Sequence, residues 1–130
     1  GASVLSSYRI SNNGSITLVN GSVGAGQSAA CWVVITNNKK YAYTTNTASN
    51  NLSTFSINSF SGDIGVREAV SATTPAGPID AALTNNSKFL YVLNSGGNSI
   101  SVFGVGGNGN LNSVQLVGGL PQGATGLAAK

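Results

Sequence analysis

The chain has 130 residues, of which 41% are hydrophobic and only 7% are charged, and its formal net charge is +3. This composition excludes a phosphate-neutralising nucleic-acid site, because such sites need clustered basic residues and only Lys39 and Lys40 are neighbours here. The chain has no histidine, which excludes histidine acid–base chemistry and histidine metal ligation, and its longest apolar run, Ala29 to Ile35, is too short to span a membrane.

A repeat with a period of about 48 residues organises the sequence. Thr36 to Lys40 (TNNKK) recurs 48 residues later as Thr84 to Lys88 (TNNSK), and Asn50 to Ile57 recurs at the same offset as Asn98 to Val105. A third, degenerate copy of the same pattern begins at Leu5. Periods of this length are typical of solenoids, propellers and other repeat architectures.

Each copy of the repeat is expected to contain four short strands. In chain order, the strands predicted for the middle copy are Trp32 to Thr36, Tyr41 to Thr45, Leu52 to Ile57 and Val66 to Ala72. They are rich in β-branched and aromatic residues, and they are separated by Asn, Lys, Ser and Gly clusters that favour turns over a continuing helix. Four strands per repeat of this length predict a blade of a β-propeller, all of it antiparallel sheet.

The third strand of each copy predicts sheets that are covered on both faces. Phe55 and Ile57 share one face of the strand and Leu52 lies on the other, and this division is repeated around Phe103. Sheets stacked face against face explain this pattern, because each sheet then has a neighbour on both sides. The alternative is an ordinary antiparallel sandwich that contains a duplicated stretch.

Two short motifs identify a family. Tyr91-Val92-Leu93-Asn94, followed by Asn98 to Phe103, resembles the YVTN-type repeat of the lactonase-like, seven-bladed β-propellers, and Tyr43-Thr44-Thr45-Asn46 is a second copy. The resemblance implies the propeller fold. Its members include 6-phosphogluconolactonase-like enzymes, fungal muconate-lactonising enzymes and exported repeat proteins without demonstrated catalysis. Enzymes of this kind carry His, Glu and Arg at the channel mouth, and no motif here matches such a site, so the sequence yields no catalytic residue, metal ligand or cofactor.

The repeat divides the chain into one propeller segment of about 2.5 to 3 blades. Residues 1–31 are expected to form a partial blade, 32–79 and 80–122 two complete blades, and 123–130 the start of a next strand or blade. A family ring has seven blades, so the expected partners are the remaining blades of the same propeller or further copies of this chain. Both a fragment of a longer ring and a self-assembling short chain fit the sequence.

Two residues are the candidates for ligand binding. Asp80 and Trp32 occupy equivalent repeat positions on the strands expected to line the central channel. A channel carboxylate can bind a cation or a polar ligand, or it can bond backbone amides at a loop end. The Trp32 ring can stack on a sugar, although burial between blades is the interpretation that we favour, because aromatic side chains chiefly supply packing area.

The other reactive side chains have structural interpretations. Asp63 lies in a hairpin signature, and Glu68 is expected to be a solvated charge on an outer strand that discourages aggregation. Cys31, the only cysteine, is expected to be a small buried hydrophobe without a catalytic base. The glycine-rich stretch from Gly104 to Gly109 is predicted to be a hairpin loop.

The sequence therefore favours a non-catalytic, exported binding or structural repeat module whose ligand, a small molecule or a glycan, is not identified. The alternative is a part of a lactone-hydrolysing enzyme whose catalytic residues lie on other blades. Whether the protein is an enzyme is left open. The Ser, Thr, Asn and Gly-rich surface suggests an extracytoplasmic location in the periplasm, outside the cell or at its surface.

Overall fold

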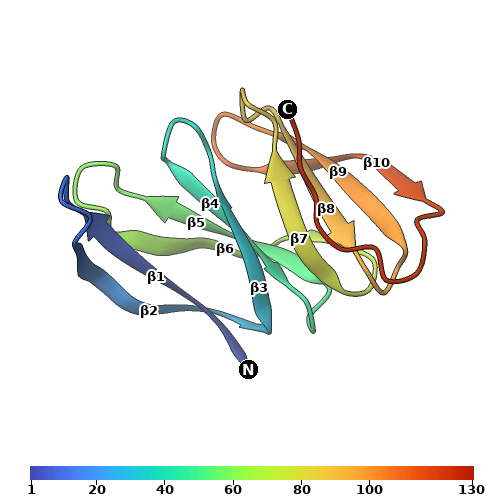
Figure 1. Ribbon diagram of the computed structural model, residues 1–130, viewed down its shortest axis with the longest axis horizontal. Coiled ribbons are helices and arrows are strands. Elements are labelled where there is room, and N and C mark those ends of the chain that lie inside the picture. Colours follow the sequence, from blue (N-terminus) through green and yellow to red (C-terminus); the bar gives the residue numbers. More distant parts are fainter.

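A computed structural model describes all 130 residues, and it contains ten β-strands and no helix. The first two strands, β1 (Ala2–Ile10) and β2 (Ile16–Ser28), pair with each other as an antiparallel hairpin, called the first hairpin below (Figure 1). The predicted all-β class is confirmed. No helix exists that could cross a membrane.

Two four-stranded antiparallel sheets follow the first hairpin. The middle sheet contains β3 (Ala30–Ile35), β4 (Tyr41–Asn46), β5 (Asn51–Ile57) and β6 (Ile64–Thr73). The last sheet contains β7 (Pro78–Leu83), β8 (Phe89–Asn94), β9 (Ser99–Val105) and β10 (Leu111–Gly118). In both sheets the strands pair in sequence order, which is the meander of a propeller blade, and each of the four strands predicted for the middle copy overlaps an observed strand.

The sequence repeat is also a repeat of backbone conformation. Lys39 and Ser87, which are 48 residues apart, both adopt left-handed backbone with φ values of 57° and 54°. The hairpin turns of the three sheets each carry a glycine at φ near 84°, namely Gly14, Gly62 and Gly109. Glycine adopts this conformation without the steric cost of a Cβ atom, so the glycines of the repeat are required by the turns.

The asparagine that ends each YVTN-type motif ties the second strand of a blade to the third. The Asn46 side-chain amide donates hydrogen bonds to Asn51 Oδ1 at 2.7 Å and to Ser53 Oγ at 2.8 Å. In the last sheet, the Asn94 amide donates to Ser101 Oγ at 2.9 Å. Both asparagines are fully buried. A buried amide needs such partners, which explains why serine recurs with asparagine in the repeat.

The three sheets stack face against face around two apolar clusters. One cluster lies between the middle and last sheets and includes Leu52 and Phe103. The other lies between the first hairpin and the middle sheet and includes Phe55 and Ala25. Leu52 and Phe55 therefore point to opposite faces of β5, as predicted. A two-layer sandwich has a single core between two sheets, and the arrangement here is a stack of blades instead.

The contact between the middle and last sheets is fixed by a tyrosine and a glycine turn. The buried Tyr43 hydroxyl donates a hydrogen bond of 3.0 Å to the carbonyl oxygen of Gly109, in the turn between β9 and β10. A Cβ atom on Gly109 would lie 2.6 Å from the ring of Tyr41, so the turn has no room for a side chain. Gly104 and Val105 belong to β9, so the predicted hairpin loop is shorter than expected and lies between Val105 and Leu111. This turn is also an interface element.

Residues 119–130 follow the last sheet and form no strand. They run along the front of β7 and β8 (Figure 1), and the Leu127 amide donates a hydrogen bond of 2.7 Å to Asp80 Oδ2. The strand expected from residue 123 is not observed in this chain. Its assignment to a next blade stays a prediction.

Candidate functional site

The inner strands of the two complete sheets bring the predicted binding residues into the same region. β3 and β7 are the first strands of their sheets and lie side by side near the centre of the molecule (Figure 1). Trp32 lies on β3 and Asp80 lies on β7, each next to an irregularity in strand pairing. The repeat thus places both residues at the inner edge of the stack.

Both oxygens of the Asp80 carboxylate accept hydrogen bonds from backbone amides of the protein itself. Its side chain is only 7% exposed. Oδ1 accepts a hydrogen bond of 2.7 Å from the Ala81 amide, and Oδ2 accepts one of 2.7 Å from the Leu127 amide. This geometry matches the interpretation in which Asp80 bonds backbone amides, and it fastens the C-terminal segment to β7.

Trp32 is 49% exposed, so the burial between blades that we favoured from the sequence is not observed. Its backbone amide donates to Thr45 Oγ1 at 3.0 Å, and the residue lines a largely apolar cavity of about 170 Å³ together with Val4, Leu5 and Val33. Asp80 does not line this cavity. The structure therefore offers Trp32 as a separate stacking surface and does not join the two candidates into one pocket.

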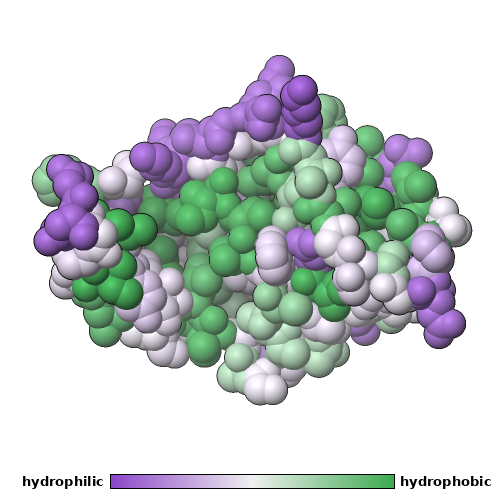
Figure 2. Space-filling model, viewed as in Figure 1, coloured by the Kyte–Doolittle hydropathy of each residue, from purple (hydrophilic) through white to green (hydrophobic).

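Cys31 is exposed, and the prediction that it is buried is wrong. The first hairpin packs against Ala42, Phe55 and Ile57 on this side of the middle sheet, and it leaves a cavity beside β3. Cys31, Val33 and Ile35 are consequently left in contact with solvent. Figure 2, viewed as Figure 1, shows hydrophobic residues across the centre of the visible face and hydrophilic residues along its upper rim.

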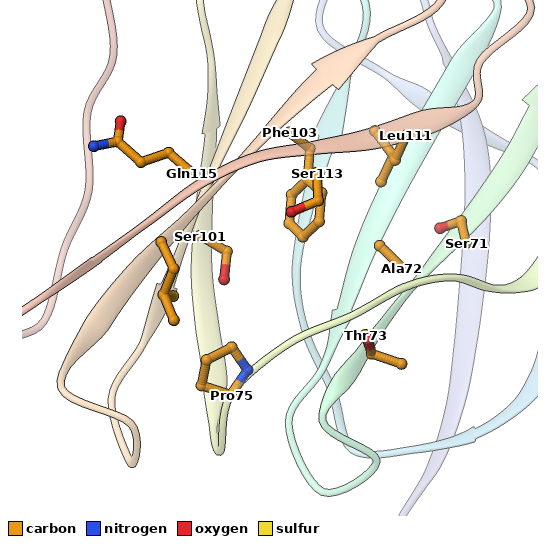
Figure 3. Close-up of a pocket in the computed structure, with 10 residues that line it drawn as sticks. Ser71, Ala72, Thr73, Pro75, Ser101, Phe103, Leu111, Ser113 and Gln115 are labelled. Carbon is orange, nitrogen blue, oxygen red and sulfur yellow. The ribbon is translucent and has the colours of Figure 1, made fainter.

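The largest cavity, of about 380 Å³, opens between β6 and the β9–β10 pair (Figure 3). Serine and threonine hydroxyls from both sheets surround it, together with the Phe103 ring, whereas the Gln115 amide points away from it. The residues that carry these hydroxyls are Ser71, Thr73, Ser101 and Ser113. The lining holds no charged side chain, so the cavity suits a neutral polar molecule.

Sequence reasoning did not identify this hydroxyl-lined cavity. Ser71 and Thr73 come from one sheet and Ser113 from the next, at least 40 residues later. The only signal in the sequence is the repeated serine of the third strand, Ser53 and Ser101, which is explained equally well by the bond to asparagine. The cavity depends on the angle between two sheets, and a strand pattern does not encode that angle.

Basic and aromatic residues gather at the turn end of the two complete sheets. Lys88 and Tyr41 line a second polar cavity of about 240 Å³ between the sheets. The Arg67 guanidinium lies 5.8 Å from the centre of the Tyr41 ring, a cation–π contact, and it donates a hydrogen bond of 2.7 Å to Asn110 Oδ1. This end of the stack is suited to polar or anionic groups.

The ionisable groups Tyr43, Asp63 and Glu68 have structural roles. Burial, assisted by the neighbouring Tyr41, raises the pKa of Tyr43 to about 12, so the phenol remains a hydrogen-bond donor. Asp63 is exposed in the β5–β6 turn, where it accepts a hydrogen bond from the Ser61 hydroxyl, and Glu68 lies on the outer strand β6. These two positions agree with the sequence predictions. No three His, Cys, Asp or Glu side chains are grouped closely enough to hold a metal ion.

Comparison with known families identifies the stack of sheets. A family model described as a lactonase, 7-bladed β-propeller, matches residues 33–121, which is more than half of the chain. The chain belongs to this lactonase family. The resemblance inferred from the YVTN-type motifs is thereby confirmed, and so is the propeller fold.

Solved structures support the same lactonase-propeller fold. A putative 6-phosphogluconolactonase from Bacteroides fragilis is 18% identical with a TM-score of 0.75, and the match covers 86% of this chain and 32% of that one. For the periplasmic gluconolactonase of Pseudomonas aeruginosa the identity is 16% and the TM-score 0.73, with 94% and 37% of the two chains covered. A functionally unknown protein from Desulfotomaculum acetoxidans is 18% identical with a TM-score of 0.73, over 84% and 33%.

These matches also show how much of the length of similar structures the chain spans. It spans about a third of the length of the solved structures that it matches. No curated protein matches it. At this level of identity the similarity establishes the fold, and chemistry has to be argued from the residues of the chain.

Proposed function

We propose that these blades act as a non-catalytic binding or structural module within a lactonase-like propeller. The proposal rests on the hydrogen bonding and burial of Asp80, the one carboxylate on an inner strand. Both of its oxygens accept hydrogen bonds from backbone amides, and its side chain is buried. A general acid or base must reach the substrate proton, and this carboxylate instead holds the C-terminal segment.

The ligand that fits the largest cavity is a neutral, hydroxyl-rich molecule such as a glycan. Its hydroxyl side chains can both donate and accept hydrogen bonds, and Phe103 adds an apolar ring. A sugar presents the matching combination of hydroxyls and apolar C–H groups. The exposed Trp32 ring at the inner edge supplies a second surface for stacking.

Lactone hydrolysis is the second candidate, because the family model is named for a lactonase and two similar structures carry the names 6-phosphogluconolactonase and gluconolactonase. In that case the reacting groups would lie on other blades of the ring. The remaining blades of the same propeller, or further copies of the chain, are the proposed partners.

An extracytoplasmic location is part of the proposal. It is supported by the uncharged polar surface and by the periplasmic origin named for the Pseudomonas aeruginosa structure.

A lactonase assay on the native protein that carries these blades separates the two candidates. We expect hydrolysis of gluconolactone at the spontaneous rate, and no difference between the unmodified protein, Asp80→Ala and the exposed-turn control Asp63→Ala. Turnover that is abolished by Asp80→Ala and retained by Asp63→Ala, in variants with unchanged circular dichroism, would overturn the non-catalytic proposal.

A binding experiment tests the glycan part of the proposal. We expect neutral oligosaccharides to shift the amide NMR signals of Ser113 and Thr73, and Ser113→Leu to remove those shifts. The matched control is Val114→Leu, a substitution on the same strand outside the cavity lining. Shifts that are the same in both variants would contradict binding in this cavity.

A further inference from the structure

The β3–β4 turn and the β7–β8 turn lie against each other at one end of the two complete sheets (top of Figure 1). They are equivalent in the repeat and have the sequences TNNKK and TNNSK. The Asn37 backbone amide donates a hydrogen bond of 2.9 Å to Ser87 Oγ, and the Asn37 side-chain amide donates to the Asn85 carbonyl oxygen. These bonds connect the two sheets and hold the two turns in a fixed relation.

The polar cavity of about 240 Å³, called the turn cavity below, lies between these two turns. Its volume is below the roughly 300–1,000 Å³ of sites for drug-sized ligands, so it suits a single sugar ring. Every residue that lines it belongs to the middle sheet, the last sheet or their turns. Further blades of a ring stack on the faces of these sheets, so the turn cavity is complete without them.

The two asparagines that face each other in the repeat, Asn38 and Asn86, already use their side-chain oxygens inside the turns. Asn38 Oδ1 accepts a hydrogen bond of 3.0 Å from the Lys40 amide, and Asn86 Oδ1 accepts one of 3.0 Å from the Lys88 amide. Both asparagines line the turn cavity and are exposed. Their side-chain NH₂ groups have no partner within the chain, so each can donate hydrogen bonds to a ligand.

Positive charge gathers around the turn cavity. Lys88 is the one charged residue in its lining, and Lys39 and Lys40 follow Asn38 in the β3–β4 turn. Neither Asp63 nor any other acid lines the turn cavity. The hydrophilic rim at the top of Figure 2 lies at this end of the sheets. A concave surface with one sign of charge raises the local concentration of ligands of the opposite sign.

We propose that the turn cavity binds the carboxylate of a uronic acid in an acidic polysaccharide. The Lys88 ammonium group pairs with the carboxylate, and the unpartnered NH₂ groups of Asn38 and Asn86 donate hydrogen bonds to it. The neutral Thr36 and Ser87 side chains of the lining match the hydroxyl groups of the sugar ring. This site is separate from the hydroxyl-lined cavity and does not depend on the glycan proposed there.

The spacing of the positive charges favours a sugar acid over other polyanions. Duplex nucleic acid carries one negative charge per about 1.7 Å of its axis, and binding it requires many cations in contact with phosphates. Anionic membranes are typically bound by clusters of about four to eight Lys and Arg residues. The turn cavity has one lysine among neutral hydrogen-bonding groups. A uronic acid has one carboxylate among several hydroxyls, so its charge and polarity match the lining.

The test is protection of the Lys88 amine from acetylation in the native protein that carries these blades. The probe is trigalacturonate, and its fully methyl-esterified form serves as the neutral control. We expect trigalacturonate at about ten times its Kd to slow acetylation of Lys88 about tenfold, because only the free site reacts. The methyl ester should leave the rate unchanged. Raising the salt concentration should weaken the protection, because salt screens exposed charges.

The decisive variant is Asn86→Asp. It keeps the acceptor of the Lys88 amide and replaces the donor NH₂ group by an oxygen that repels a carboxylate. The Kd for trigalacturonate, from the concentration dependence of the protection, should rise roughly tenfold or more. The matched control is Asn13→Asp, in the β1–β2 turn, where Asn13 Oδ1 accepts a hydrogen bond of 3.1 Å from the Ser15 amide. It makes the same charge change outside the turn cavity and should leave the Kd nearly unchanged.

Three results would overturn the proposal. The first is acetylation of Lys88 at the same rate with and without trigalacturonate. The second is equal protection by the methyl ester or by inorganic phosphate at the same concentration, because the carboxylate or the sugar would then not be recognised. The third is an equal loss of affinity in Asn86→Asp and Asn13→Asp, with unchanged circular dichroism, because the total charge and not the turn cavity would then attract the probe.

Discussion

The middle and last sheets have nearly the same design and different surroundings. The middle sheet is covered on one side by the last sheet and on part of the other by the first hairpin, and its Tyr43 is 1% exposed. In the last sheet the equivalent Tyr91 lies on a face without a neighbouring sheet. In repeat proteins, stability is approximately a sum of terms within each repeat and terms between neighbours. Tyr43 contributes to both terms, whereas among the contacts of these 130 residues Tyr91 contributes only to the first.

The same comparison separates residues that build the repeat from residues that depart from it. Asn46 and Asn94 occupy equivalent positions and make equivalent bonds to serine. Trp32 and Asp80 also occupy equivalent positions, but one exposes an indole ring and the other fastens a backbone segment. The side chains with roles of their own, beyond building the blade, therefore lie at positions where the two sheets differ.

The largest expected effect comes from removing an aromatic residue at the covered interface. Phe103→Ala is expected to lower the free energy of unfolding by about 3–5 kcal/mol, because it leaves a cavity between two sheets. Tyr8→Ala, at the equivalent position of the first hairpin, should cost less than about 1 kcal/mol, because half of that side chain is already in water. Urea denaturation at low protein concentration measures both values, and similar losses would mean that the hairpin face is covered.

The second effect tests the bonds that both sheets share. Asn46→Ala and Asn94→Ala are each expected to cost about 2 kcal/mol, since each removes a buried amide and leaves buried serine hydroxyls without their donor. Asn112→Ala, on the exposed outer strand β10, serves as the matched control and should change stability by less than about 0.5 kcal/mol. A large difference between Asn46 and Asn94 would show that the neighbouring sheet, and not the blade itself, sets the strength of these bonds.

The third effect is a dependence of stability on alkaline pH that the covered tyrosine, Tyr43, should produce. The folded state raises the pKa of Tyr43 from 10.0 to about 12, so the stabilisation is fully present below pH 10. It is lost as the pH rises toward 12, because the unfolded chain releases this proton first, and the loss amounts to as much as about 1.4 kcal/mol per pH unit. Urea denaturation between pH 9 and 11 should show this slope in the unmodified chain. Tyr43→Phe should remove it and Tyr91→Phe should leave it, and a slope that survives Tyr43→Phe would assign it to another group.

The sequence predicted the parts of the fold that repeat, and it failed where a residue depends on what lies beside it. The four strands, the glycine turns and the opposite directions of Leu52 and Phe55 follow from the 48-residue period and from the alternation within strands. The burial of Cys31 and Trp32 was wrong, because local hydrophobicity indicates that a residue can be buried and not that a neighbour is present to bury it.

The candidate site was predictable only in part, for a related reason. The position of Asp80 on an inner strand follows from its place in the repeat. Its partner Leu127 lies 47 residues away in a segment without a strand, so no local pattern joins them. The hydroxyl-lined cavity likewise combines Ser71 of one sheet with Ser113 of the next, and depends on how the sheets are inclined.

The smallest expected effect concerns the hydrogen bond between Asp80 and the Leu127 amide. It tests whether Asp80 holds a backbone segment, in contrast to Trp32, whose ring is exposed. Asp80→Asn keeps the shape of the side chain and replaces a charged acceptor of the Leu127 amide by a neutral one, which weakens the bond. We expect global stability to change by less than about 1 kcal/mol, and the Leu127 amide to exchange its hydrogen up to roughly tenfold faster. Asp63→Asn, in an exposed turn, should leave that exchange unchanged. Unchanged exchange in Asp80→Asn would mean that the carboxylate does not hold the segment, and it would return Asp80 to the candidates for binding a ligand in the channel.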